Sequence, residues 1–208
     1  MTRGVSELLA WARRLQAIAQ TGVAYGEPSE HDRERYAQVR RIAAEMLSKN
    51  GDVEALDDQL AREIGHATPK LDVRGVVFRG DEILLVRDRA EGWWTLPGGW
   101  ADVGESPSVA VAREVYEESG YEAHAVKLLA LYDRDRHPYG PHQWHVWKAI
   151  FLCELHDGER GELGLETDEA RFFAKNALPE LLHARATKML IDRAYEHKAN
   201  PEWPTDFD

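Results

Sequence analysis

One segment constrains the fold of this chain more than any other, residues 99–121 with the sequence GWADVGESPSVAVAREVYEESGY. Ser106 suits a helix N-cap, Pro107 suits the first turn, and Gly120 suits the end of a helix. Between them, apolar side chains fall on one side of a helical wheel; they are Val109, Val111, Ala112, Val115 and Tyr116. The segment therefore predicts an amphipathic helix over 106–119 that packs one side against another layer.

The other side of this helix carries Glu114, Glu117 and Glu118. Glu114 and Glu118 are one turn apart, and like charges at this spacing cost roughly a few tenths of a kcal/mol. A solvated face is the ordinary interpretation of such charge. A hard dication would instead convert the repulsion into binding, and Gly98 and Gly99 just before the helix let the backbone approach a ligand closely. On the helix alone, both interpretations stay open.

The character of the sequence changes after Pro69. Before it, apolar residues recur at helical spacing in three segments, and a turn at Asn50 and Gly51 follows the second. After it come strand-like runs, two of which are joined by a hairpin at 79–81. The expected helices cover about 5–19, 36–47, 53–64, 106–119 and 179–197. The expected strands cover 71–78, 82–87, 94–96, 124–134, 143–155 and 170–173.

Strands and helices are mixed without strict alternation, which predicts an α+β fold with helices packed on a mixed sheet. The length of 208 residues suits one catalytic domain plus a smaller appendage. We expect a helical N-terminal domain over 1–66 and a catalytic domain over 67–208. The N-terminal helices are too few to bury their apolar faces alone, so they need the catalytic domain or a second subunit as a partner.

The charge of the chain restricts its partners. Its formal net charge is −11, which disfavours non-specific binding to nucleic acid or to acidic membranes. An acidic protein that handles a phosphorylated substrate needs local cations, either basic side chains or bound metal. No apolar stretch approaches the roughly 20 residues of a transmembrane helix and the N-terminus has no apolar signal core, so we expect a cytoplasmic protein. The single cysteine, Cys153, lies in an apolar run typical of a buried structural thiol.

The segment over 99–121 resembles the Nudix box, G-x5-E-x7-R-E-U-x-E-E-x-G-U, in which U is a bulky apolar residue. The box positions are filled in register by Gly99, Glu105, Arg113, Glu114, Val115, Glu117, Glu118 and Gly120. Tyr121 takes the last U position, where aliphatic residues are commoner. Seven fixed letters at this spacing would arise by chance roughly once in a million chains of this length. The order of strands and helices over about 71–200 also resembles the Nudix fold, an α/β/α sandwich with a mixed sheet.

This resemblance implies a role for each residue of the box. Glu114 and Glu118 would be the main ligands of Mg²⁺ or Mn²⁺, joined by the carbonyl of Gly98. Glu117 would be a further ligand or would orient the attacking water. The arginine of the box and its first glutamate would form an ion pair that holds the other glutamates. The implied reaction is metal-assisted attack of water on a phosphorus atom of a pyrophosphate.

The general base is left open between a glutamate of the box and one of the acidic loop at 156–169. Within this loop we favour Glu166, because it lies close before the strand expected at 170–173, where a loop could fold over the metals. A solvated acidic loop is the competing interpretation.

Four residues are candidates for substrate binding; they are Arg87, Trp100, Tyr132 and Arg134. The aromatic side chains offer faces for a nucleotide base, and the arginines stand where strands end near loops and could bind phosphate. Core packing is the competing interpretation for the aromatic residues, and ordinary surface charge is the competing interpretation for the arginines.

The N-terminal segment resembles part of one Nudix branch. Residues 15–20, Gly22, Tyr25 and residues 34–36 look like the helical extension of the branch described as ADP-ribose or CDP-choline pyrophosphatases. This resemblance implies a homodimer built partly from the extension. It also implies a substrate in which a nucleoside diphosphate is linked to a second group, cleaved to a nucleoside monophosphate and a phosphorylated partner. ADP-ribose and CDP-alcohols are both candidates.

Two alternatives stay open. A house-cleaning Nudix enzyme for damaged nucleoside triphosphates would use the same chemistry on another substrate. A non-catalytic sensor would bind ADP-ribose or a nucleotide without cleaving it. Such sensors usually lose box glutamates and carry a basic DNA-binding appendage, whereas this chain has all the glutamates and no clear basic recognition helix.

Overall fold

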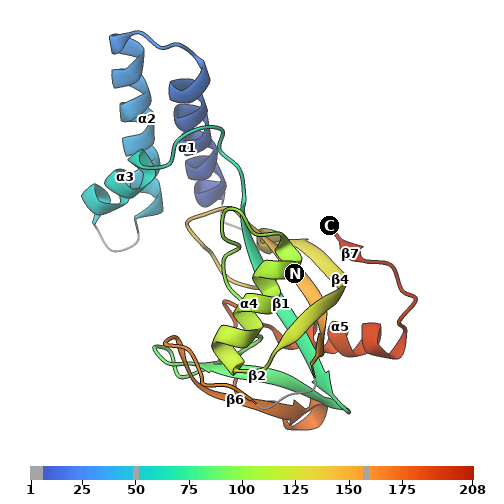
Figure 1. Ribbon diagram of the computed structural model, residues 1–208. Helices are drawn as coiled ribbons and strands as arrows, with labels where there is room; N and C mark the ends of the chain where they lie inside the picture. Colours follow the sequence, from blue (N-terminus) through green and yellow to red (C-terminus); the bar gives the residue numbers. More distant parts are fainter. Residues whose placement is uncertain (1–6, 49–51, 157–159) are drawn as a thin grey trace. The chain divides into compact units, whose positions relative to one another are not determined.

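The structure, a computed structural model, describes residues 7–48, 52–156 and 160–208. The chain divides into two compact units, which are described separately (Figure 1). The first unit contains the chain up to Pro69 together with Pro141–His145, and the second contains Lys70–Gly140 and Val146–Asp208. Residues 141–145, which lie far from the N-terminal helices in the sequence, therefore pack with them.

Helices form the first unit; they are α1 (Glu7–Tyr25), α2 (Glu30–Leu47) and α3 (Val53–Ala61). Their apolar core contains Ala12, Ala44, Leu47 and Leu60, with Trp144 packed against it. Helix α2 begins earlier than its apolar pattern, because the side chain of Ser29 accepts a hydrogen bond from the backbone N–H of Asp32 and caps a polar first turn. The turn expected at Asn50 and Gly51 lies outside the described residues.

A mixed sheet, seven-stranded within the described residues, is the basis of the second unit. The strands are β1 (Lys70–Arg79), β2 (Glu82–Asp88), β3 (Trp94–Thr95), β4 (Ala123–Asp133), β5 (Val146–Leu155), β6 (Thr167–Ala174) and β7 (Asp206–Phe207). The helices are α4 (Pro107–Ser119) and α5 (Lys188–Ala199). The strand order is β3-β2-β1-β5-β4-β7, with β6 paired to β2. β1 is parallel to β5 and β4 to β7, whereas the other pairs are antiparallel. The predicted α+β fold with a mixed sheet is confirmed.

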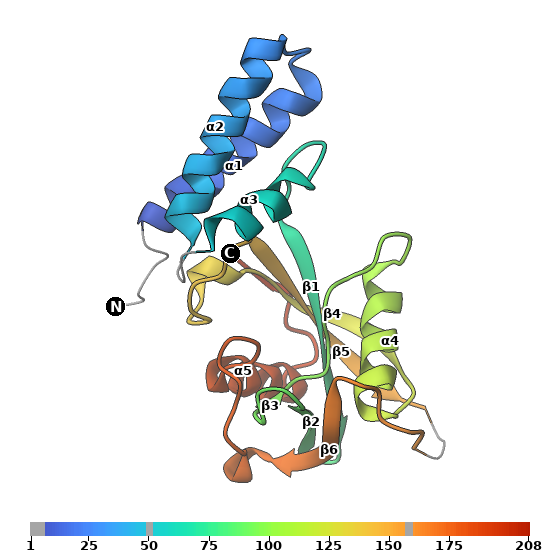
Figure 2. The same cartoon turned by 90° about the vertical axis from the view of Figure 1, so that its left-hand side faces the viewer.

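Helices α4 and α5 cover opposite faces of this sheet, as Figure 2 shows. Residues of β1 alternate between the two cores: Val73 and Val77 join the cluster under α4, and Val76 joins the cluster under α5. Helix α4 can approach β1 closely because Gly75 has no side chain. A Cβ at this position would lie 2.5 Å from a methyl carbon of Val115 on α4. The predicted apolar side of α4 therefore faces the sheet.

Some boundaries differ from those expected. Helix α5 begins at Lys188 rather than near residue 179, because Thr187 caps it and the preceding residues form a loop in which Leu181 makes a β-bridge to β3. Strand β5 begins later than expected, and β6 begins earlier, at Thr167. Strand β7 was not predicted, since two residues leave no periodic signal.

Two expectations drawn from composition can be compared with the structure. Cys153 on β5 is buried as expected, and burial raises the pKa of its thiol to about 12. Among the described residues, no helix is both long and apolar enough to cross a membrane.

Candidate active site

Helix α4 has the end signals that the sequence predicts. The side chain of Ser106 accepts a hydrogen bond from the backbone N–H of Val109 at 3.4 Å. At the other end, Gly120 adopts a left-handed φ of 71° and its N–H donates to the carbonyl of Tyr116 at 2.7 Å. The helix is thus fixed at both ends, and the positions of its glutamates follow from that register.

The three glutamates of α4 form a gradient of exposure. The side chain of Glu117 is 54% exposed and that of Glu114 is 13% exposed. Glu118 is buried, with 5% of the residue exposed. Burying a carboxylate is costly unless partners compensate its charge, so the contacts of the two inner glutamates decide whether the arrangement is stable.

Gly98 and Gly99, which precede α4, lie directly against these inner glutamates. The N–H of Gly98 donates to Glu118 Oε2 at 2.8 Å. Gly98 has a φ of 143°, and a Cβ there would clash with the carbonyl oxygen of Val73. A Cβ at Gly99 would lie 2.9 Å from Glu114 Oε1. The loop therefore brings bare backbone against two carboxylates, which is possible only without side chains.

Arg113 lies among three carboxylates of the box, those of Glu105, Glu114 and Glu117. Its Nε and Nη2 donate to Glu105 at 3.0 Å each, and its Nη1 donates to Glu114 at 2.9 Å and to Glu117 at 3.1 Å. Its hydrogen bond holds the pKa of Glu105 below the usual value. The predicted ion pair between Arg113 and Glu105 is present, and Arg113 also orients Glu114 and Glu117.

Burial makes the ionised forms of Glu114 and Glu118 less favourable. It raises the pKa of Glu118 to about 7, although Arg74 and the N–H of Gly98 oppose this rise. It also raises the pKa of Glu114, against the hydrogen bond from Arg113. The buried carboxylate of Glu118 and the half-buried one of Glu114 both have raised pKa values, so a cation would stabilise this site. Carboxylate oxygens are the ligands that hard divalent cations prefer, so the residues fit such an ion.

A buried ionic network lies on the strands under the glycine loop. Arg74 on β1 donates to Asp72 Oδ1 at 2.7 Å, and Lys148 on β5 donates to Asp72 Oδ2 at 2.6 Å. Arg74 also donates to the carbonyl of Leu96, near the start of the glycine loop, at 3.2 Å. Burial would raise the pKa of Asp72, but the two cations lower it below its usual value. The network thus fixes the base of the loop that touches the glutamates.

Glu166 lies beside the C-terminal end of α4. Its side chain is exposed, and its backbone carbonyl accepts a hydrogen bond from the N–H of Arg89 at 2.9 Å. The next residue, Thr167, donates from its hydroxyl to the carbonyl of Glu118 at 2.7 Å. The structure therefore brings the chain at Glu166 next to the helix that carries the box glutamates.

The matches of this chain to known protein families agree with this geometry. A family model described as NUDIX domain matches residues 68–193, which is more than half of the chain. The chain belongs to the Nudix hydrolase family. A second family model, described as a UDP-X-like N-terminal oligomerisation domain, matches residues 6–57. Nudix hydrolases generally use a divalent metal, in agreement with the carboxylates of α4, and this chain is an enzyme of the pyrophosphatase kind.

Individual relatives are similar along much or all of the chain. A Bacillus subtilis protein with the provisional name ADP-ribose pyrophosphatase is 39% identical over 210 residues, covering 100% of both chains. The crystal structure of an ADP-ribose pyrophosphatase from Streptococcus suis is 35% identical with a TM-score of 0.62, covering 68% of this chain and 100% of that one. The crystal structure of a UDP-X diphosphatase is 32% identical with a TM-score of 0.62, covering 99% of this chain and 100% of that one.

The four substrate-binding candidates of this Nudix enzyme lie in different surroundings. Trp100 is 45% exposed and stands at the box, where its carbonyl accepts from Arg113 at 3.5 Å. Arg87 on β2 makes two hydrogen bonds to the carboxylate of Asp168, at 2.8 and 3.0 Å. Of the four, the structure brings Trp100 into direct contact with a box residue.

Tyr132 and Arg134 lie at the end of β4. Tyr132 is half-buried and donates from its hydroxyl to Asp206 at 3.2 Å. Arg134 is buried and donates to the backbone carbonyls of Tyr139 and Gly140 at 3.1 and 2.6 Å. These contacts hold the loop after β4 and the C-terminal strand in place.

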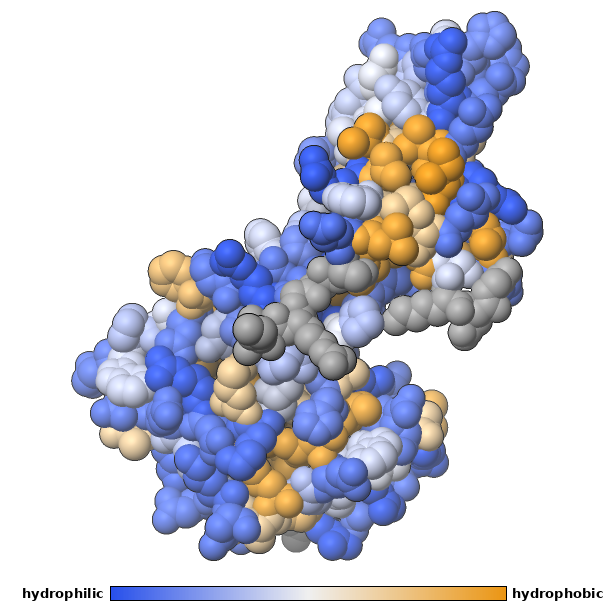
Figure 3. Space-filling view, turned by 180° about the vertical axis from the view of Figure 1, so that it is seen from behind, coloured by the Kyte–Doolittle hydropathy of each residue, from blue (hydrophilic) through white to orange (hydrophobic). Residues whose placement is uncertain are grey.

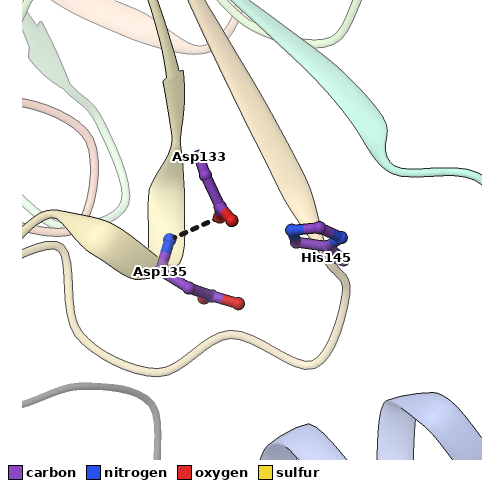
Figure 4. A group of neighbouring side chains, drawn as sticks. All are labelled: Asp133, Asp135 and His145. Atoms are coloured by element: carbon purple, nitrogen blue, oxygen red, sulfur yellow. Dashed lines mark hydrogen bonds between the residues drawn. The ribbon is translucent and has the colours of Figure 1, made fainter. Parts of the chain in front are cut away.

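The carboxylates of Asp133 and Asp135, which flank Arg134 in the sequence, lie close to each other (Figure 4). The side chain of Asp133 accepts a hydrogen bond from the backbone N–H of Asp135 at 3.0 Å. This bond caps the short 3₁₀ helix Arg134–Arg136. Local backbone geometry therefore accounts for the position of Asp133.

Sequence patterns missed two basic residues that act electrostatically on Glu118. Arg74 lowers its pKa, and so does Arg185, which is ion-paired with Asp88 at 2.9 Å. Arg185 lies in the loop before α5, in the range where a helix was expected. The available signal for Arg74 was its place inside an apolar strand, since a charge at such a position needs a buried partner.

Replacing Gly99 with alanine tests the contact between the loop and Glu114. The backbone of Gly99 lies outside the left-handed region, so alanine is tolerated there, but its Cβ would lie 2.9 Å from Glu114 Oε1. The flexible carboxylate must move, so we expect Gly99→Ala to unfold within roughly 2 °C of the wild type. We expect its pyrophosphatase activity to fall at least about tenfold. Thermal unfolding and steady-state hydrolysis measure the two effects, and wild-type activity in this variant would mean that the position of Glu114 is not critical.

Proposed function

We propose that this chain hydrolyses the pyrophosphate bond of a nucleoside diphosphate linked to a second group, with Mg²⁺ as cofactor and Mn²⁺ as an effective substitute. The products are a nucleoside monophosphate and the phosphorylated second group. One observation carries the proposal: Glu118, buried on α4, accepts a hydrogen bond from the bare backbone of Gly98, with Glu114 and Glu117 beside it.

The proposed ligands of the cation are Glu114, Glu118 and the carbonyl of Gly98, with Glu117 as a further ligand. When bound, a divalent cation neutralises charge on the bridging phosphates and makes water more acidic. Arg113 holds Glu114 and Glu117 through charge-assisted hydrogen bonds. These two carboxylates are thus oriented before a substrate arrives, which lowers the entropy lost on binding.

We assign the general base to Glu166. Its exposed side chain can hold a water molecule and accept its proton. Its backbone is anchored by Arg89 on one side, and Thr167 anchors the chain to α4 on the other. A mobile base would spend little time at the productive distance, so this anchoring supports the assignment. A glutamate of the box is the competing base.

The names of the relatives support a nucleoside diphosphate-linked substrate. Two of them are called ADP-ribose pyrophosphatase and one UDP-X diphosphatase. These names favour ADP-ribose and UDP-linked compounds as candidates, and the resemblance of the N-terminal extension adds CDP-choline. Trp100 offers an exposed ring beside the box for stacking on a base. Arg87, Tyr132 and Arg134 are the other proposed substrate contacts.

A panel of substrates with product identification tests this function. The panel contains ADP-ribose, CDP-choline, a UDP-sugar and nucleoside triphosphates, each with Mg²⁺. We expect the nucleoside diphosphate-linked compounds to be cleaved to monophosphates with a kcat/KM at least about tenfold above that of the triphosphates. The opposite preference would favour a house-cleaning triphosphate enzyme. Binding without hydrolysis of any compound would favour a sensor.

Two variants in the same assay test the assigned roles. Glu118→Gln should lower kcat by about two orders of magnitude and raise the Mg²⁺ concentration for half activity, because a metal ligand is lost. Glu166→Gln should lower kcat by about 100-fold with a smaller change in the Mg²⁺ requirement, because only proton transfer is lost. Glu162→Gln, at another exposed glutamate of the same loop, is the matched control and should behave as wild type. A silent Glu166→Gln would move the base to the box.

We further propose that residues 1–66 form a dimerisation domain and residues 67–208 form the catalytic domain. The match of residues 6–57 to an N-terminal oligomerisation domain supports this division. So does the grouping of α1, α2 and α3 into one unit with its own apolar core. The partner we propose for that unit is a second copy of this chain.

An exposed apolar strip on α1 supports the second copy. Ala12 and Ala19 are buried within the helical unit, whereas Leu8, Trp11 and Ile18 are 50%, 52% and 59% exposed. At 100° per residue these three lie beside the buried positions, so the apolar side of the helix is only partly covered. Apolar surface gathers on this unit in Figure 3. Contiguous apolar surface of this kind is typical of a subunit interface.

Ile18→Glu tests the proposed interface. The added carboxylate would be buried against its symmetry copy without a partner, so we expect the variant to be monomeric while the wild type is a dimer at micromolar concentration. Light scattering measures the mass, and circular dichroism checks the helices. Met189→Glu, at a residue of α5 that is 47% exposed, is the control and should leave the dimer intact. A monomeric wild type at all micromolar concentrations would rule the proposal out.

A further inference from the structure

The carboxyl end of α4 is closed by the loop that precedes β6. A helix end leaves its last carbonyl groups without intrahelical donors, so they must find partners elsewhere. Here the successive carbonyls of residues 117, 118, 119 and 120 each accept a hydrogen bond from the loop. The donors are, in that order, the N–H of Gly164 at 2.7 Å, the hydroxyl of Thr167 at 2.7 Å, Nε of Arg160 at 2.9 Å and the N–H of Gly161 at 2.8 Å.

Glycines permit this close approach. A Cβ at Gly164 would lie 2.5 Å from the carbonyl oxygen of Glu117, and a Cβ at Gly120 would clash with the carbonyl oxygen of Gly161. Gly120 also holds a left-handed φ of 71°, which turns its own carbonyl toward the loop. The loop is therefore fitted to the helix end along several residues rather than touching it at one point.

Thr167 differs from the other donors, because its donor is a buried side chain, 2% exposed. It donates to the carbonyl of Glu118, whose carboxylate accepts from the N–H of Gly98. Glu118 is thus held at both its backbone and its side chain. On the opposite side, the guanidinium of Arg89 donates to the carbonyl of Thr167 and its N–H to that of Glu166, each at 2.9 Å. Thr167 therefore joins the last turn of α4 to the segment that carries Glu166 through a buried side chain, beside the hydrogen bonds from Gly161, Gly164 and Arg160.

We propose that Thr167 is a positioning residue for the hydrolysis, whose hydroxyl keeps Glu118 and Glu166 in a fixed relation. The inference rests on the proposed function of these two glutamates. Without the hydroxyl, the carbonyl of Glu118 is buried without its donor, so Glu118 can shift relative to Glu166 even though the neighbouring hydrogen bonds from residues 160, 161 and 164 remain. Metal affinity then falls because a ligand moves, and turnover falls because the base is no longer aligned with it.

Two substitutions at this position separate the hydrogen bond from the packing. Thr167→Val keeps the β-branched shape that a strand favours and removes the donor, whereas Thr167→Ser keeps the donor. Thr205→Val is the matched control, because the hydroxyl of Thr205 also donates to a backbone carbonyl at 2.7 Å, that of Leu128 on β4. It removes the same kind of bond from the same unit but not from α4.

Electron paramagnetic resonance monitors the binding of Mn²⁺, so it measures the metal affinity of the site without turnover. We expect Thr167→Val to weaken Mn²⁺ binding about tenfold or more and to raise the Mg²⁺ concentration for half activity by a similar factor. Thr167→Ser and Thr205→Val should both stay within about twofold of the wild type. Wild-type Mn²⁺ affinity in Thr167→Val would overturn the proposal. So would an equal loss in Thr205→Val.

The two readouts keep this inference separate from the function it rests on. If the wild type binds Mn²⁺ but cleaves no compound of the panel, the proposed function fails, while the Mn²⁺ titrations still decide the role of Thr167. If Thr167→Val does not fold, Thr167→Ala removes the same donor with a smaller side chain. That variant should weaken Mn²⁺ binding in the same direction, and an unchanged affinity would overturn the proposal.

Discussion

The hydrogen bond from the N–H of Gly98 to Glu118 ties the loop after β3 to helix α4, and much of the second unit depends on it. It requires a residue without a side chain at Gly98, where a Cβ would meet the carbonyl of Val73. It also requires α4 to lie close to β1, which Gly75 allows. A carboxylate is thereby held inside the protein by backbone, at a site where burial raises its pKa.

Such a site is costly, and the surrounding charges limit the cost. Arg113 holds Glu105, Glu114 and Glu117 through hydrogen bonds, and Arg74 on β1 acts on Glu118. Arg74 is itself buried and is held by Asp72, which Lys148 also contacts. The glutamates are thus supported by cations that have fixed positions of their own. This arrangement agrees with the charge of the chain, because an acidic protein that binds phosphates needs its positive charge concentrated at the site.

Sequence analysis predicted the features that depend on neighbours along the chain. The helix over 106–119 was predictable because its cap, its apolar side and its glutamates all follow one period, and the box spacing identified the family. Contacts between distant segments left no such signal. The pairing of Asp72 with Lys148 depends on the register of β1 against β5, and the contact of Thr167 with α4 depends on the path of a loop. Helix α5 was expected to begin too early, because apolar residues of the preceding loop continue its pattern. The roles of Glu166 and of the four substrate-binding candidates stay predictions.

The central claim is that the glutamates of α4 serve attack of water on phosphorus within a pyrophosphate. Hydrolysis in oxygen-18 water, with the label located by mass spectrometry of both products, tests it most directly. The account predicts that the label appears on a phosphate of the nucleoside monophosphate or of the phosphorylated partner, whichever phosphorus is attacked. Label found only on a sugar or alcohol carbon would mean that a glycosidic or ester bond is broken at carbon, and would contradict the account.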